Sequence, residues 1–259
     1  MAPPPVSSSR VGVVHVHSNY SHDGRDSLAD LRSFAQRQGI GFVGLTDHAE
    51  DFDAGIFERF QHECTSLSDG STRLIAGLEF RFAGFPGLHL LALGLSRWIE
   101  PTSPAEFMVM APDASRLTIV AHPILPRYTV PREVLEGIDA IEVWNGVYNT
   151  RWLPDPRAIR LLHETQRVRP AVVGTAGLDQ HDRRNDREIR VILEQEGDDP
   201  LAELKAGRFI NRGRTMSFDP WIRWSRFRLG ALSLARWSFD RLERGQERIS
   251  RALKRAHSS

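Results

Sequence analysis

The residues that could do chemistry in this 259-residue chain are histidines and carboxylates placed directly behind short apolar runs. The stretch VVHVHSNYSHDG carries histidines at 15, 17 and 22 and an aspartate at 23, behind the apolar run 11–14. His15 and His17 are two residues apart, so on an extended strand they point to the same side. That side either faces a metal ion or belongs to a polar surface loop.

Further candidate ligands also lie where an apolar run ends. In a (β/α) barrel all of these ends lie on one face, where the loops build the active site. A single histidine there is more often structural, but five of the ten histidines (15, 17, 48, 122 and 181) end such runs, which a random scatter would rarely produce. We therefore expect these side chains to converge. They are Asp47 and His48, Glu79, His122, Glu142 and Asn145, and Asp179 and His181.

Two other histidines near these runs fit the pattern less well. His89 opens its apolar run and does not close it, so by position alone it is a core residue. Nothing fixes the direction of His22. His62 and His163 fall in stretches of helical pattern and His257 in the C-terminal tail, and we expect all three to be solvated.

Apolar runs alternate with stretches of helical period along most of the chain. Strands are predicted at 10–17, 40–48, 73–80, 88–95, 116–123, 138–145 and 171–181, with an eighth at 187–194. Helices are predicted at 27–38, 53–67 and 156–168, with a shorter one at 199–209. Strands that are apolar on both faces and alternate with helices predict an α/β fold with a parallel sheet or barrel.

The bulk composition is that of a globular protein, but the charge is unevenly distributed. Hydrophobic residues make up 41% and charged residues 26%, and the net charge is +1. Residues 221–259 carry ten Arg/Lys and three Asp/Glu, a balance of +7, which leaves −6 for residues 1–220. No apolar stretch reaches the ~20 residues that span a bilayer, and the N-terminus has no apolar signal region, so we expect a cytoplasmic protein. The single cysteine, Cys64, excludes an intramolecular disulfide and a multi-cysteine zinc site.

The ligand types indicate a site with more than one metal ion. Imidazole and carboxylate without thiolate suit Zn, Mn or Fe, and the candidates are too numerous for one tetrahedral ion. Two or three divalent ions a few Å apart are a natural arrangement for hydrolysing phosphate esters. The pattern therefore predicts a multinuclear metallohydrolase without indicating its substrate.

The ordered motifs resemble those of the polymerase and histidinol phosphatase (PHP) superfamily. HVHSNYSHDG, GLTDH, GLE, HLLALG, AHP, IEVWNG and GLDQH occur in the family's order over about residues 10–210. The last motif reads GTAGLDQH where the common form is G-S-D-x-H, but it keeps the D-x-H pair. The resemblance implies a stand-alone metal-dependent phosphoesterase, folded as a distorted (β/α)7 barrel with a trinuclear site.

The resemblance also implies a ligand set. One metal would be held by His15, His17, Glu79 and Asp179. Glu79 would bridge to a second metal held by His89 and His122, so the resemblance assigns His89 a role that its position alone does not. A third metal would be held by Asp23, His48 and His181, with Asp23 matching the family pattern better than His22.

The expected reaction is hydrolysis of a small phosphomonoester, with a hydroxide that bridges the metals attacking phosphorus in line. We assign catalytic roles to Glu79, Asp179 and Asp47, although Asp47 could instead form a hydrogen bond behind the ligands. Phosphate-binding roles are assigned to Asn145, Arg127 and Arg183, which follow strand ends. Two alternatives stay open. One is a phosphodiesterase or exonuclease, which the acidic body disfavours, and the other is a metal-binding scaffold that acts through its tail.

Three regions are expected: a disordered N-terminus (1–9), the metallohydrolase barrel (10–220) and a basic amphipathic helical tail (221–259). In the tail, Trp221, Trp224 and Phe227 are three apart, and Leu234, Leu242, Ile249 and Leu253 recur at roughly helical spacing. The tail either packs on the barrel as an extra helix or binds an anionic membrane surface or an acidic partner.

Overall fold

The computed structural model describes residues 10–195 and 199–239, so the predicted disorder of residues 1–9 and the end of the tail lie outside it. The fold is a mixed α/β fold with two six-stranded sheets. The first has the order β12-β11-β10-β1-β2-β4 and the second the order β3-β5-β6-β7-β8-β9. The first sheet contains β1 (Val11–Val16), β2 (Phe42–Leu45), β4 (Arg73–Ile75), β10 (Arg190–Leu193), β11 (Phe209–Arg212) and β12 (Ser217–Phe218). The second contains β3 (Asp47–His48), β5 (Gly77–Arg81), β6 (His89–Leu93), β7 (Leu117–Ala121), β8 (Ala140–Asn145) and β9 (Val173–Gly177).

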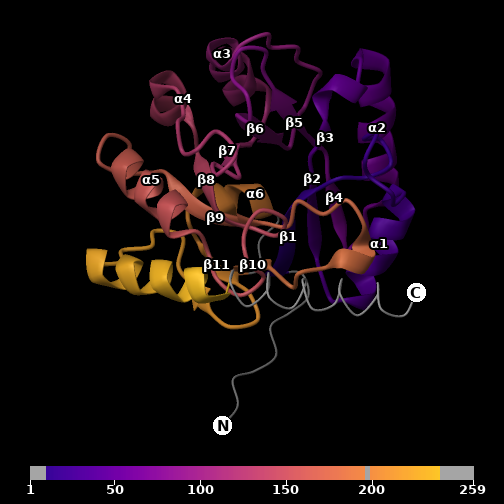
Figure 1. The fold of residues 1–259 in the computed structure, drawn as a ribbon. Coiled ribbons are helices and arrows are strands. Elements are labelled where there is room, and N and C mark those ends of the chain that lie inside the picture. The colour runs from indigo at the N-terminus through magenta and orange to yellow at the C-terminus, as the bar shows by residue number, and fades with distance from the viewer. Residues whose placement is uncertain (1–9, 196–198, 240–259) are drawn as a thin grey trace, which may run out of the picture.

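The helices lie around the outside of the strands (Figure 1). Ser27 caps α1 by accepting a hydrogen bond from the Asp30 backbone N–H. The helices predicted at 27–38, 53–67, 156–168 and 199–209 are present, and α3 and α4 were not predicted. They are α1 (Leu28–Arg37), α2 (Ala54–Leu67), α3 (Pro104–Ala114), α4 (Arg132–Gly137), α5 (Pro156–Gln166) and α6 (Pro200–Lys205), with 3-10 turns η2 (Ala49–Asp51) and η3 (Arg183–Asn185).

The two sheets form one continuous unit. Each of the runs predicted at 40–48 and 73–80 is two strands, because the chain passes from the first sheet to the second at Thr46 and at Ala76. On the other side β1 adjoins β9, where the Leu178 N–H donates to the Val14 carbonyl at 2.8 Å. Val14, Leu91 and Val173, which come from both sheets, belong to one buried apolar cluster. The predicted α/β fold class is confirmed.

The strand directions differ from the prediction of an all-parallel arrangement. β6 pairs antiparallel with both β5 and β7, and His89, its first residue, pairs with Arg81 and Ala121. The start of β6 therefore lies beside the ends of β5 and β7, since antiparallel neighbours place opposite ends at one edge. This geometry brings His89 to the same edge as the residues that close the other strands.

The described part of the C-terminal extension packs on the rest of the fold. Trp224 contacts Phe218 edge to face at 5.6 Å between ring centroids, and His163, predicted to be solvated, donates from Nε2 to the Ile222 carbonyl at 2.5 Å. Residues 226–239 are helical. This helix buries Leu229 and Leu232, and the Arg236 guanidinium lies 3.2 Å from the Asp155 carboxylate.

The side of this helix that packs on the fold does not contain Leu234, the first residue of the predicted apolar stripe. Leu234 is 66% exposed because Leu229 and Leu232 occupy the buried side. Leu242, Ile249 and Leu253, the other members of the predicted stripe, lie outside the described residues. In the described part of the chain, every helix is too short or too polar to cross a lipid bilayer.

Candidate metal centre

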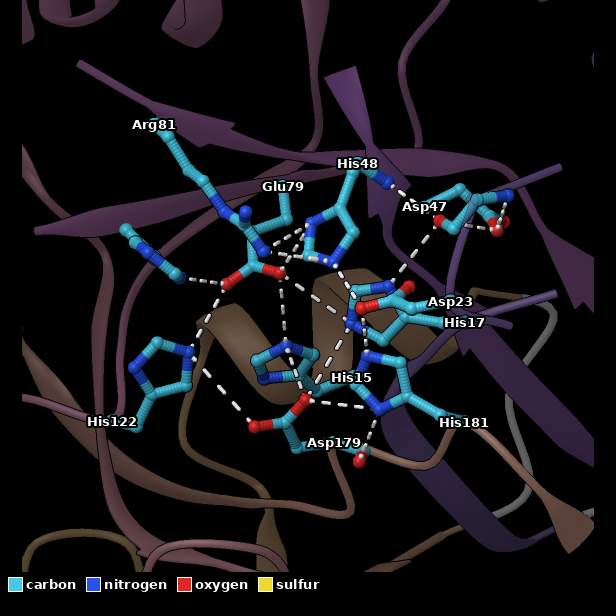
Figure 2. A network of polar contacts seen from close by, with 12 residues as sticks. His15, His17, Asp23, Asp47, His48, Glu79, Arg81, His122, Asp179 and His181 are labelled. Atoms are coloured by element: carbon cyan, nitrogen blue, oxygen red, sulfur yellow. Dashed lines mark hydrogen bonds and ion pairs between the residues drawn. The ribbon is translucent and has the colours of Figure 1, made fainter. Parts of the chain in front are cut away.

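The nine predicted metal ligands lie together at one end of the strands. Each comes from a strand or from the loop that directly follows or precedes it, so segments up to 166 residues apart meet. Figure 2 shows the histidine rings and carboxylates of these segments pointing toward a common centre. They are His15, His17, Asp23, His48, Glu79, His89, His122, Asp179 and His181.

The first group within this centre has the spacing of a tetrahedral ion site. His15 Nε2 lies 3.6 Å from Glu79 Oε2 and 3.5 Å from Asp179 Oδ1, and His17 Nε2 lies 3.4 and 3.6 Å from the same two oxygens. Four donors about 2.1 Å from a tetrahedral zinc ion would be roughly 3.4 Å apart. Both Nε2 atoms are buried without a hydrogen-bond partner among the described residues. The spacing of these four donor atoms therefore suits coordination of one metal ion better than hydrogen bonds among the four side chains.

The second group is built on the other oxygen of Glu79. Its Oε1 accepts from His89 Nδ1 at 2.6 Å and from His122 Nε2 at 3.0 Å. His15, Glu79 and His122 also bring donor atoms within 4.8 Å of one another. Since Oε2 faces the first group and Oε1 the second, Glu79 has the geometry of a bridging carboxylate.

The third group is centred on Asp23. Its Oδ2 lies 3.2 Å from His48 Nε2 and 3.2 Å from His181 Nε2. His22 borders this group without joining it: its side chain is 56% exposed, its Nδ1 pairs with Asp51 at 2.8 Å, and its ring stacks on His48 at 5.4 Å between centroids. In the first loop, the structure thus directs the aspartate toward the histidines and the neighbouring histidine toward solvent.

Three of these residues have backbone torsions that L-residues rarely adopt. φ is +64° at His15, +23° at His122 and +52° at Asp179. Such conformations cost about 1–3 kcal/mol each and persist only where the surroundings impose them. His15 lies at the register shift between Val14 and Val16 in β1, and His122 and Asp179 follow the ends of β7 and β9.

Glu142 forms a second layer behind the first group. The Nδ1–H of His15 donates to Glu142 Oε1 at 2.8 Å, which leaves the Nε2 lone pair directed at the centre. Glu142 Oε2 accepts from the His122 backbone N–H at 2.8 Å and from Asn145 Nδ2 at 3.0 Å. Carboxylates behind ligating histidines commonly fix the tautomer and ring orientation. The sequence places Glu142 at a strand end but does not distinguish a ligand from such a supporting residue.

The electrostatics of the first group reflect crowded, buried charges. Burial opposes the charged form of His15, but the carboxylates of Glu142, Asp179 and Glu79 outweigh it and raise the pKa of His15 well above its ordinary value. For His17 burial dominates and lowers the pKa to about 4. Burial also acts against ionised Glu79, yet the surrounding histidines hold its pKa well below the ordinary range. The ionised carboxylates thus favour a positive charge at this position, which a bound cation would supply.

Asp47, to which we assigned a catalytic role, faces away from the centre and organises the first loop. Its Oδ1 accepts hydrogen bonds from the backbone N–H groups of Ser18 and Ser21 at 2.7 and 3.1 Å and from both hydroxyls. Burial nevertheless raises the pKa of Asp47 to about 6. Ser21 in turn accepts from the His48 backbone N–H at 2.8 Å. The geometry matches the alternative weighed for Asp47, a hydrogen bond behind the ligands.

Two of the three predicted phosphate-binding residues are already bound to carboxylates. The Asn145 amide donates to Glu142 and to Asp179, at 3.0 and 3.3 Å. Arg183 is bound to the carboxylates of Asp26 and Asp30. Arg127 is exposed in the loop after β7 and forms no hydrogen bond or ion pair from its side chain to any described residue.

Two residues missed by the sequence reasoning border the centre. Arg81 Nη2 donates to His48 Nε2 at 2.9 Å, and its Nη1 lies 3.0 Å from Glu50 Oε1. The Tyr148 ring lies 4.9 Å from the His122 ring, centroid to centroid, and is 38% exposed. A signal for Arg81 was available, because a residue two positions after Glu79 on a strand shares its face. Tyr148 follows the strand end at Asn145 but has no such periodic signal.

The fold and this donor set define an α/β protein with clustered side chains that could hold divalent metal ions. Residues 14–124 match the sequence profile of the family described as PHP domain. This part of the chain is therefore similar to the PHP domain family, which agrees with the resemblance drawn from the motifs.

Individual relatives are similar over different lengths. A Thermotoga maritima protein named "Probable histidinol-phosphatase" is 32% identical over 99 residues, which are 36% of this chain and 42% of the relative. The chain thus matches less than half the length of this curated relative. The crystal structure of PsfC from Pseudomonas syringae PB-5123 is 15% identical, covers 89% of this chain and 98% of its own, and superposes with a TM-score of 0.53. At this identity the likeness establishes the fold alone.

Proposed function

We propose that this protein is a metal-dependent phosphoesterase that hydrolyses a small phosphomonoester. The observation that carries the proposal is the convergence of nine imidazole and carboxylate side chains in overlapping groups, six of them buried, with the two oxygens of Glu79 facing different groups. Imidazole with carboxylate suits Zn, Mn or Fe. The PHP domain match supports the same class of activity.

Two or three divalent ions in this centre would supply Lewis acidity toward the phosphoryl oxygens. The chain's own residues hold and orient the site around them. Glu142 fixes the tautomer of His15, and Asp47 fixes the loop that carries Asp23. Arg81 places a permanent positive charge beside His48, and its planar fork suits a phosphoryl oxygen pair.

The charge of the chain favours a small substrate. Residues 1–220 have a formal net charge of −6, whereas binding along a nucleic-acid strand requires a positive track. The relative's name makes histidinol phosphate one compound to test. The cationic groups near the centre, such as Arg81, are few and suit a single phosphoryl group.

The test uses the full chain stripped of metal by a chelator and reloaded separately with Zn, Mn or Fe. Metal content per chain is measured by elemental analysis. Turnover is then measured on p-nitrophenyl phosphate, bis-p-nitrophenyl phosphate, histidinol phosphate and a short oligonucleotide. We expect two or three ions per chain and release of phosphate from the monoesters.

The matched variants are Asp179→Asn, within the first group, and His62→Asn, an exposed histidine in α2. Asp179→Asn should lose metal and turnover together, while His62→Asn should keep both. If the protein hydrolyses the diester or the oligonucleotide faster than the monoesters, it is a phosphodiesterase and the proposed monoesterase is wrong. If the protein binds metal stoichiometrically but hydrolyses none of the phosphoesters, the proposed enzymatic activity is refuted and the protein is a metal-binding scaffold.

A further inference from the structure

The C-terminal helix, residues 226–239, carries two apolar side chains that are largely exposed. Leu229 and Leu232 are buried against the fold, whereas Phe227 is 85% and Leu234 is 66% exposed. Phe227 and Leu234 are seven residues apart and so lie on one line along the helix, opposite the buried pair. Exposed apolar patches often mark a surface that contacts another molecule or a membrane.

A basic cavity lies at the start of this helix, between it and α5. Its volume is about 440 Å³, and it is lined by Arg160, His163, Glu164, Arg167, Trp224, Arg226 and Leu229. Three arginines thus oppose one glutamate. None of the three arginine side chains forms a hydrogen bond or ion pair with another described residue, unlike Arg236 on the same helix, which pairs with Asp155.

Residues that line the cavity are adjacent in sequence to exposed apolar residues. Arg226, which lines the cavity, directly precedes Phe227. Arg167, on the opposite wall, directly precedes Val168, which is 68% exposed. The combined surface, called the basic-apolar face below, consists of Arg160, Arg167, Val168, Arg226, Phe227 and Leu234.

Charge decides which occupant suits this face. A second copy of the chain in a two-fold contact would bring like-charged arginine sets together. The residues that follow the helix, 240–259, carry six Arg/Lys against three Asp/Glu, so they too are positive. An anionic phospholipid surface offers both complements at once: phosphate headgroups for the cavity and an interfacial apolar layer for Phe227 and Leu234.

We propose that the basic-apolar face docks on an anionic membrane surface, with a phospholipid headgroup in the arginine-lined cavity and the apolar side of the helix in the interface. The helix lies along the surface and does not span it. The metal centre takes no part in this contact, so docking is independent of any phosphoesterase activity.

The test is sedimentation of the full chain with vesicles of phosphatidylcholine alone or of phosphatidylcholine and phosphatidylglycerol in equal parts. We expect binding to the anionic vesicles only, weakened by added salt. Arg160→Gln/Arg167→Gln/Arg226→Gln should weaken the partition about 100-fold, since each arginine near the surface contributes roughly fivefold. Phe227→Ser/Leu234→Ser should weaken it about tenfold or more.

The controls are Arg97→Gln and Val109→Ser, two exposed residues away from the helix, of which Val109 is 75% exposed on α3. They should bind like the unaltered chain. Equal binding to both vesicle types, or no binding to either, overturns the proposal without any variant. An equal loss in the controls also overturns it. A dimer seen by light scattering that Phe227→Ser/Leu234→Ser dissociates, without vesicle binding, would assign the face to a second copy.

Discussion

Replacing Glu142 with glutamine should weaken metal binding at the first group without changing any proposed ligand. Its two oxygens accept from His15 Nδ1, from the His122 backbone N–H and from Asn145 Nδ2, at 2.8, 2.8 and 3.0 Å. Glutamine has one acceptor oxygen and one NH2 group. If its oxygen stays with His15, its NH2 faces two donors, and if it turns round, the His15 tautomer is no longer fixed.

The size of the effect follows from these contacts. Loss of a carboxylate behind a ligating histidine typically costs 10–100-fold in metal affinity, or about 1.4–2.7 kcal/mol. The orphaned buried donors should also destabilise the metal-free protein by about 1–3 kcal/mol. The assay is competition for zinc between the protein and a chelating indicator, with thermal unfolding measured on the same samples.

Glu63→Gln is the matched control for Glu142→Gln. Glu63 accepts a hydrogen bond from the Tyr20 hydroxyl at 2.8 Å but lies outside the metal centre. It should leave zinc affinity unchanged. If Glu142→Gln, folded and tested beside it, bound zinc as tightly as the unaltered chain, the supporting role assigned to Glu142 would be refuted.

Three further predictions concern the centre and its surroundings. Removing metal with a chelator should lower the unfolding temperature, and restoring an ion at 100 times its Kd should regain about 2.7 kcal/mol; a melting temperature insensitive to metal would contradict a centre that exists only in the folded state. Asn211→Ala should destabilise the fold by about 2–4 kcal/mol in denaturant titrations, because it orphans the Ala176 N–H and the Gly174 carbonyl that the amide bonds at 2.7 and 2.8 Å; a change under about 0.5 kcal/mol would mean that water replaces the amide. Gly177→Ala should reduce metal content and stability together, since its Cβ would lie 1.7 Å from Glu142 Oε1; Gly55→Ala in α2, whose Cβ meets nothing closer than 3.4 Å, is the tolerated control.

Several features of the centre were accessible from sequence because strand ends are marked by local pattern. A run such as RLTIVAHP predicts both a strand and the position of His122 at its end. Arg81 and Glu142 show the limit of this reasoning. Glu142 lies on a predicted strand and Arg81 directly follows one, but a strand pattern does not tell whether a side chain reaches an ion, a ligand or the layer behind it.

The direction of β6 was the main feature that local pattern could not supply. An apolar run reads the same whether it pairs parallel or antiparallel, and the partner strands decide which end meets the centre. His89 therefore looked like a core residue from its place at the start of a run. Only the resemblance to the PHP motifs gave it a role before the structure placed its Nδ1 2.6 Å from Glu79.

The sequence by itself determined the alternation of strands and helices, the donor types and their places at strand ends, because these depend on local periodicity and side-chain chemistry. The tertiary structure alone decided which oxygen of Glu79 faces which histidines, that Asp47 and Asn145 support the site from behind, and that Leu234 points outward. Those outcomes depend on strand direction and on packing between segments far apart in the chain. No local pattern encodes them.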